Sequence, residues 1–274
     1  MSSGRPGHGA VREPPSPVRP RARVASVLGA ALLAAMVVAQ VASGLQPRPI
    51  VLTSVVVLLL AASALALACA THSPARVVAA FAAVVAAGYA AEWVGIRTGL
   101  PFGDYNYTGV LWPAPGGVPV IVALAWGGMG LAAHAVAAAV APGSRAARIV
   151  TGALALTAWD LFLDPQMIRL GLWVWHDPGP YRDVPLSNFA GWLVVSLLVM
   201  TLLERVLAEP AAWSAGLVSI YTVMAVMETI GFAAVFVPPD PLVATAGGLS
   251  MGLFTLLAWR RGLRRRPLPG AGPA

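Results

Sequence analysis

Long apolar blocks alternate along the chain with short segments that contain Pro, Gly or Arg. A helix needs about 20 apolar residues to cross the hydrocarbon core of a bilayer. Windows of that kind lie near residues 24–44, 50–70, 77–96, 118–140, 148–164, 190–208, 213–236 and 242–259. The fifth window differs from the others because it ends in Asp160 and Asp164. The pattern predicts an all-α, polytopic transmembrane helical bundle of about eight spans.

The composition agrees with this fold class and excludes several functions. Hydrophobic residues make up 58% of the 274 residues and charged residues 11%, whereas a soluble domain has about 25% charged residues. Cys69 is the only cysteine, which excludes an intramolecular disulfide and a zinc knuckle or iron–sulfur site. The four histidines have no paired spacing, which excludes the membrane oxygenases that hold two iron ions with many histidines.

The net charge of +7 comes largely from the two Arg-rich ends of the chain. Residues 1–23 are rich in Pro, Gly and Arg and predict a disordered basic cytoplasmic tail. Residues 24–262 form the predicted transmembrane helical domain, and residues 263–274 a second basic cytoplasmic tail. An uncleaved first helix is favoured over a signal peptide, because its apolar segment is long enough to span and the cleavage match at 41–43 is weak.

Basic residues gather on the cytoplasmic side of membrane proteins. With both termini on that side, the short loops that carry Arg76, Arg145 and Arg148 face the cytoplasm as well. Topology and anionic lipids therefore explain the charge, and we expect membrane lipids rather than nucleic acid as partners. The expected location is a bacterial or archaeal cell membrane.

Four carboxyl groups are predicted at a similar depth near the opposite side of the membrane: Glu92, Asp160, Asp164 and Glu228. An ionisable group inside a span costs at least about 2.5 kcal/mol and normally faces the interior of the bundle. Asp160 and Asp164 are four residues apart and share one helix face. Two such carboxyls in a dry site cannot both ionise, so one of them is expected to remain an acid at neutral pH. The alternative is structural: Asp164 caps the next turn, and Asp160 pairs with an arginine such as Arg169.

The two loops predicted on that side, 97–117 and 165–189, are rich in Trp, Tyr, Pro and Gly. Aromatic faces stabilise a nearby cation and line pockets for flat apolar ligands. The alternative is an aromatic belt that anchors helices at the membrane interface. Val118-Pro119 is followed by Trp126 at the same spacing as Val184-Pro185 by Trp192. This faint repeat suggests that helix hairpins recur along the chain.

The spacing of Asp160 and Asp164 also admits a magnesium site for a diphosphate, as in membrane prenyltransferases. That chemistry needs several carboxylates from two helices and basic residues for the phosphates. Only Arg97, Arg169 and Arg182 lie on the predicted side, and the chain has no second Asp-rich motif. We therefore favour acid chemistry and expect no metal ligands.

Two blocks of motifs surround the predicted acids and aromatic loops. The first block is Glu92-x-x-Gly95-x-x-Thr98-Gly99-x-Pro101-Phe102-Gly103-x-Tyr105-x-Tyr107-Thr108, followed by Gly117-Val118-Pro119 and Trp126. The second comprises Asp160-Leu161-x-x-Asp164-Pro165, Gly171-x-Trp173-x-Trp175, Tyr181-x-x-Val184-Pro185 and Asn188-Phe189-x-Gly191-Trp192. Together they cover about a third of the chain. Both blocks resemble the integral-membrane carotenoid biosynthesis proteins, a family that includes carotenoid 1,2-hydratases and the enzyme that hydrates bisanhydrobacterioruberin.

The resemblance implies the hydration of a terminal trisubstituted double bond of an acyclic carotenoid to a tertiary alcohol. Such a reaction needs a dry acid, π-faces around the cation and a controlled water molecule, and it needs no cofactor. Asp160 or Asp164 would donate the proton, and Glu92 or Glu228 would position the water. The predicted substrate-binding residues are Tyr105, Tyr107, Trp126, Trp173, Trp175, Tyr181, Asn188 and Trp192.

Expected partners are the carotenoid or isoprenoid lipid substrate, membrane lipids and other enzymes of the carotenoid pathway. Two alternative functions remain open on the sequence alone. Intramembrane acids would also serve a proton-coupled transporter or a lipid-binding membrane protein. A carotenoid cyclase would protonate the same kind of alkene but close a ring instead of adding water.

Overall fold

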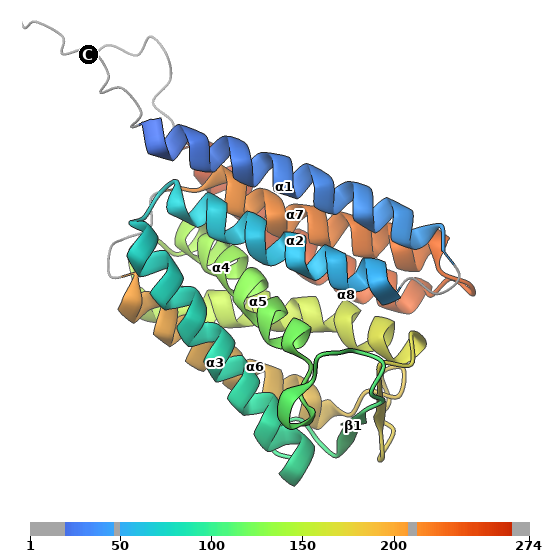
Figure 1. The fold of residues 1–274 in the computed structure, drawn as a ribbon. Coiled ribbons are helices and arrows are strands. Elements are labelled where there is room, and N and C mark those ends of the chain that lie inside the picture. Colours follow the sequence, from blue (N-terminus) through green and yellow to red (C-terminus); the bar gives the residue numbers. More distant parts are fainter. Residues whose placement is uncertain (1–19, 47–49, 208–212, 265–274) are drawn as a thin grey trace, which may run out of the picture.

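The computed structural model describes residues 20–46, 50–207 and 213–264. Within these ranges, eight helical segments are long and apolar enough to cross a membrane (Figure 1). The helices are α1 (Pro20–Gly44), α2 (Ile50–Cys69), α3 (Pro74–Thr98), α4 (Val120–Val140), α5 (Arg145–Arg169), α6 (Leu186–Val206), α7 (Ala215–Ile230) and α8 (Pro241–Arg264). The predicted all-α polytopic bundle is therefore confirmed.

Helix α4 forms the centre of the bundle, where it packs against α2, α3, α5, α6, α7 and α8. Its residues are buried without interruption from Ala125 to Ala139. Most of them are Ala or Gly, and such small side chains let neighbouring backbones approach closely inside a membrane. Helix α1 lies at the periphery against α2 and α7 (Figure 1).

The two long loops meet at one end of the bundle, beyond the carboxyl ends of α3 and α5. Strand β1 (Tyr105–Tyr107) from the first loop pairs antiparallel with β2 (Trp173–Trp175) from the second. A short 3₁₀ helix, η1 (Pro115–Gly117), then leads into α4. The sequence indicated two aromatic loops but gave no sign that they pair, because each strand has only three residues.

Helix α5 continues past Pro165, although the fifth predicted span ended at residue 164. A proline has no backbone N–H, so the carbonyl four residues earlier loses its helical hydrogen bond. That carbonyl belongs to Leu161, and the hydroxyl of Tyr181 donates to it at 2.9 Å. The loop after β2 thus supplies the hydrogen bond that Pro165 removes, and the helix reaches Arg169.

Other boundaries differ from the prediction by a few residues. Helix α1 begins at Pro20, and α7 ends at Ile230, where the π-helical turn η2 (Gly231–Val235) follows. Residues 1–19 and 265–274, which make up most of the two predicted tails, lie outside the described residues. Their disorder and their cytoplasmic location stay predictions.

A buried ion cluster lies at the opposite end of the bundle from the paired loops. Glu204 of α6 accepts hydrogen bonds from Arg148 of α5 at 2.6 and 2.8 Å, and lies 2.9 Å from the imidazole Nε2 of His134 in α4. The Glu204 side chain is only 6% exposed. A buried carboxylate is tolerated when hydrogen-bonded cations surround it, so this cluster ties three helices together.

Candidate functional site

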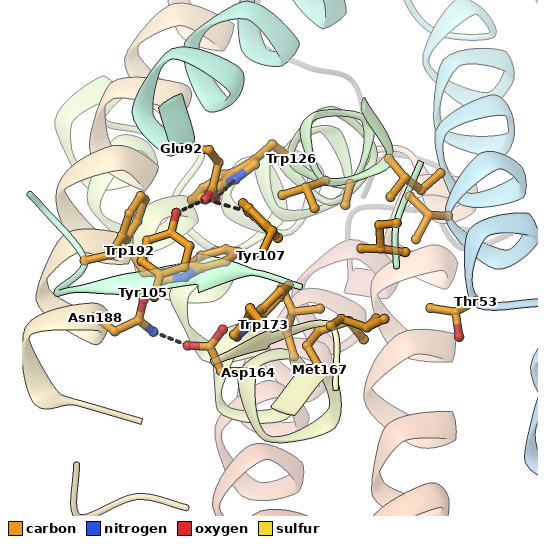
Figure 2. A pocket seen from close by; sticks show the side chains of 18 of the residues that line it. Thr53, Glu92, Tyr105, Tyr107, Trp126, Asp164, Met167, Trp173, Asn188 and Trp192 are labelled. Atoms are coloured by element: carbon orange, nitrogen blue, oxygen red, sulfur yellow. Dashed lines mark hydrogen bonds between the residues drawn. The ribbon is translucent and has the colours of Figure 1, made fainter. Parts of the chain in front are cut away.

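A narrow cavity of about 60 Å³ lies beneath the paired strands, between α2, α3, α4, α5 and α6. Its wall is predominantly apolar and aromatic, and its polar groups include the side chains of Glu92, Asp164 and Asn188 (Figure 2). A cavity of this volume holds a few water molecules or the end of an apolar chain. Its lining therefore defines the candidate site.

Glu92, near the end of α3, receives three hydrogen bonds. The hydroxyls of Tyr105 and Tyr107 both donate to its Oε2, the second at 2.8 Å, and the indole N–H of Trp126 donates to Oε1 at 3.1 Å (Figure 2). The Glu92 side chain is buried. A carboxylate with its two oxygens offers about four acceptor positions, so one position remains for a ligand.

Local backbone features bring these donors to Glu92. Gly88 lies one helical turn before Glu92, and a Cβ there would approach the Trp126 ring to 2.7 Å. Only a glycine lets the two helices approach closely enough for this hydrogen bond. In strand β1, Tyr105 and Tyr107 point to the buried side because alternate residues of a strand share a face, and the intervening residue is exposed.

Burial raises the pKa of the Tyr105 and Tyr107 hydroxyls well above the usual value, and the nearby Glu92 carboxyl raises it further. Both groups lie in the loop outside the spans. They stay protonated over the whole physiological pH range. Tyr105 and Tyr107 therefore act as permanent hydrogen-bond donors to Glu92.

Asp160 and Asp164 share one amide. The Nδ2 group of Asn188, in the first turn of α6, donates to Oδ2 of Asp160 at 2.7 Å and to Oδ2 of Asp164. Both aspartates are buried, and Oδ1 of Asp160 has no hydrogen-bond partner among the described residues. Two carboxyls held this close by one amide favour a state with a single shared proton. Asp164 lines the cavity, whereas Asp160 lies behind it.

Aromatic rings form most of the remaining wall. Trp126 and Trp192 stack with their centroids 4.0 Å apart, and Trp159 contacts Trp192 edge to face. The repeat noticed in the sequence thus places its two tryptophans against each other. The indole N–H groups of Trp159, Trp173 and Trp175 are buried without a partner among the described residues. A buried N–H without an acceptor is costly, so these groups offer donors to a ligand or a water molecule.

The structure brings most of the predicted site residues together. Around the cavity lie Glu92, Tyr105, Tyr107, Trp126, Asp164, Trp173, Trp175, Asn188 and Trp192, and Asp160 is linked to them through Asn188.

Two predicted site residues lie elsewhere. The Tyr181 hydroxyl donates to a backbone carbonyl of α5, and its ring packs edge to face against Phe189. Glu228 lines a second, neighbouring cavity. In contrast, Thr53 of α2 and Met167 of α5 line the site without having been singled out. Thr53 and Ser54 interrupt the apolar run near the start of α2, and this is a signal that could have pointed to the helix.

Comparison with known proteins supports the family resemblance found in the sequence. Residues 53–254 match the family model described as carotenoid biosynthesis protein. A bisanhydrobacterioruberin hydratase from Haloarcula japonica is 32% identical over 121 residues, which are 42% of this chain and 41% of that protein. The chain thus spans about two fifths of the length of this curated relative. No solved structure matches this chain. Because the family model covers nearly three quarters of the sequence, the chain belongs to the family of carotenoid biosynthesis proteins.

Proposed function

We propose that this protein hydrates a terminal trisubstituted double bond of an acyclic carotenoid and produces a tertiary alcohol. One observation carries the proposal: the same small aromatic cavity is lined by Asp164, which is one member of a carboxyl pair, and by Glu92, a separate carboxyl with three hydrogen bonds. The family assignment supplies the substrate class. The relative from Haloarcula japonica, a hydratase by name, supports the reaction type.

The aspartate pair acts as the general acid in this proposal. Asp164 lines the cavity and gives its proton to the less substituted carbon of the alkene, while the π electrons form the new C–H bond. The other carbon becomes a tertiary cation. Asp160 and Asn188 distribute the negative charge that is left on the pair. A positioned general acid contributes about 10²–10⁴-fold to a rate.

Glu92 and the rings then stabilise the cation. Glu92 would carry the negative charge of the site in this proposal, and its three donors would offset part of the cost of burying that charge. The faces of Trp173, Trp175 and Trp192 add cation–π attraction.

A water molecule completes the reaction. The unpartnered indole N–H of Trp173 or of Trp175 donates to its oxygen, which leaves one lone pair free to attack the cation. Glu92 accepts a hydrogen bond from the water through its remaining acceptor position. The water oxygen forms the C–O bond, and the proton that it loses returns to the aspartate pair. The net change is the addition of one water to one double bond, so every catalytic group ends in its starting state.

The orientation in the membrane is part of the proposal. Arg145 and Arg148 begin α5 at the end of the bundle opposite to the cavity. The positive-inside rule then places that end, and both termini, in the cytoplasm. The reaction site would lie near the outer boundary of the membrane.

Pigment analysis tests the function. The gene is expressed in cells that accumulate acyclic carotenoids with different end groups, and the pigments are separated and weighed by mass spectrometry. We expect more polar products that are heavier by one water for each modified end. Unchanged pigments would contradict the proposal and favour a transporter or lipid-binding protein. An isomer of unchanged mass would contradict it and favour a cyclase.

A further inference from the structure

A second cavity of about 330 Å³ adjoins the site. It lies between α1, α2, α5, α7 and η2 and shares part of its wall with the first cavity. The shared residues are Thr53 and Val57 of α2 and Trp159, Leu163 and Met167 of α5. A single row of side chains therefore separates the two spaces.

The second cavity reaches the surface of the bundle between α1 and α7. Val41 of α1 and Ile230 of α7 line it and are 51% and 48% exposed. Both are apolar residues of predicted membrane spans, so the opening faces lipid. Helix α1 is the peripheral helix of the bundle (Figure 1). An apolar molecule can therefore enter from the bilayer without crossing water.

Most of the lining is apolar, including the flexible side chains of Met224 and Met227, which adapt to ligands of irregular shape. Its polar residues include Gln40 and Glu228. Oε2 of Glu228 and Oε1 of Gln40 are buried without a partner among the described residues. The Glu228 side chain is only 7% exposed. Buried polar atoms in native proteins are almost always hydrogen-bonded. The described residues supply no donor to these two oxygens, so a ligand or a water molecule can supply it.

We propose that this cavity is a second binding site, which takes the hydroxylated end of an isoprenoid chain. The apolar walls fit the chain, and Glu228 and Gln40 accept the hydrogen bond of its hydroxyl. The inference rests on the proposed function for its ligand class, because a tertiary alcohol on an isoprenoid end is the product of that reaction. The second cavity would receive this end on its way from the site to the lipid.

A competition experiment tests the site without relying on turnover. The purified protein in lipid nanodiscs is equilibrated with equal amounts of lycopene and 1-hydroxy-1,2-dihydrolycopene. The protein is recovered and the bound pigments are quantified. The comparison is made in an Asp164→Asn background, so that the proposed reaction cannot convert one probe into the other.

We expect the hydroxylated probe to be retained in excess. Glu228→Leu should lower the ratio of hydroxylated to hydrocarbon probe about tenfold, the effect of one hydrogen bond at the strong end of the usual range. Glu228→Gln keeps an acceptor and should stay within about threefold of the parent. Thr229→Val is the matched control: its hydroxyl donates to the carbonyl of Ala225 within the helix, and it should leave the ratio unchanged.

Equal retention of the two probes, or the same ratio in Glu228→Leu, would overturn the proposal and leave water as the occupant of the cavity. This outcome is independent of the proposed function. If cells that express the protein contain no hydrated pigment, the reaction is wrong, whereas the probe ratio still reports on the cavity. If hydration occurs and the ratio is insensitive to Glu228, only the second site is wrong.

Discussion

At the scale of single residues, the site separates two kinds of carboxyl. Asp160 and Asp164 depend on one amide group, that of Asn188, whereas Glu92 has three donors of its own. The helical spacing of the aspartates and the cost of burying them made all three predictable from the sequence. The sequence did not show which aspartate reaches the cavity: Asp164 lines it, and Asp160 lies behind Asp164.

Glu228 shows the limit of arguments from depth. It lies at the end of α7 that faces the same side as the other acids, as expected. Depth in the membrane says nothing about the direction of a side chain around the helix, which depends on how α7 packs. The packing turns Glu228 toward α1 and the second cavity.

The two tyrosines that donate to Glu92 lead to a prediction about how the protein titrates at high pH. Because the pKa of Tyr105 and Tyr107 is raised by burial and by Glu92, neither should ionise in the pH range in which an ordinary tyrosine does. The phenolate absorbance that appears between pH 8 and 11 should therefore be the same in the wild type and in the double variant Tyr105→Phe/Tyr107→Phe. A smaller absorbance change in the variant would show that one of these tyrosines titrates normally.

At the scale of elements, the apolar windows were sufficient to place all eight helices. Their boundaries were less predictable, because they depend on partners far away in the sequence. Pro165 is the clearest case: a proline after Asp164 favours the end of a helix, yet α5 continues because Tyr181 hydrogen-bonds the carbonyl that the proline leaves free. The pairing of β1 with β2 is likewise a contact between distant loops.

Replacing Tyr181 with Phe tests this role. The variant leaves the Leu161 carbonyl without its donor in a partly buried position, and losing a hydrogen bond of ordinary strength costs about 1 kcal/mol. We expect a lower thermal midpoint in detergent. Tyr89→Phe is a suitable control, because its hydroxyl also donates to a backbone carbonyl but in an exposed loop, and it should change the midpoint little. An unchanged midpoint for Tyr181→Phe would contradict the role.

At the scale of the whole molecule, chemistry and stability are concentrated at opposite ends of the bundle. The cavity, the paired strands and the aromatic loops occupy one end, and the cluster of Glu204, Arg148 and His134 occupies the other. Helix α4 contributes to both, through Trp126 and His134. Substitutions at the two ends should therefore have separable effects.

Glu204→Gln should destabilise the bundle by about 3 kcal/mol, because it leaves the mostly buried Arg148 without its counterion. Hydration per folded molecule should remain as in the wild type. Arg145→Gln is the matched control, since this arginine is 54% exposed and 3.9 Å from Glu204, and exposed pairs contribute little. The measurements are thermal unfolding and product formed per folded protein. Loss of hydration without loss of stability in Glu204→Gln would contradict the separation.

The central claim, proton transfer from the aspartate pair followed by capture of water, is tested most directly with isotopes. The purified protein in nanodiscs is supplied with an acyclic carotenoid in D₂¹⁸O, and the product is analysed by mass spectrometry. The account predicts one carbon-bound deuterium and one ¹⁸O per modified end. It also predicts a rate at least about 100-fold lower for Asp164→Asn than for the wild type. Product formation by Asp164→Asn at the wild-type rate, or a product without carbon-bound deuterium, would contradict the account.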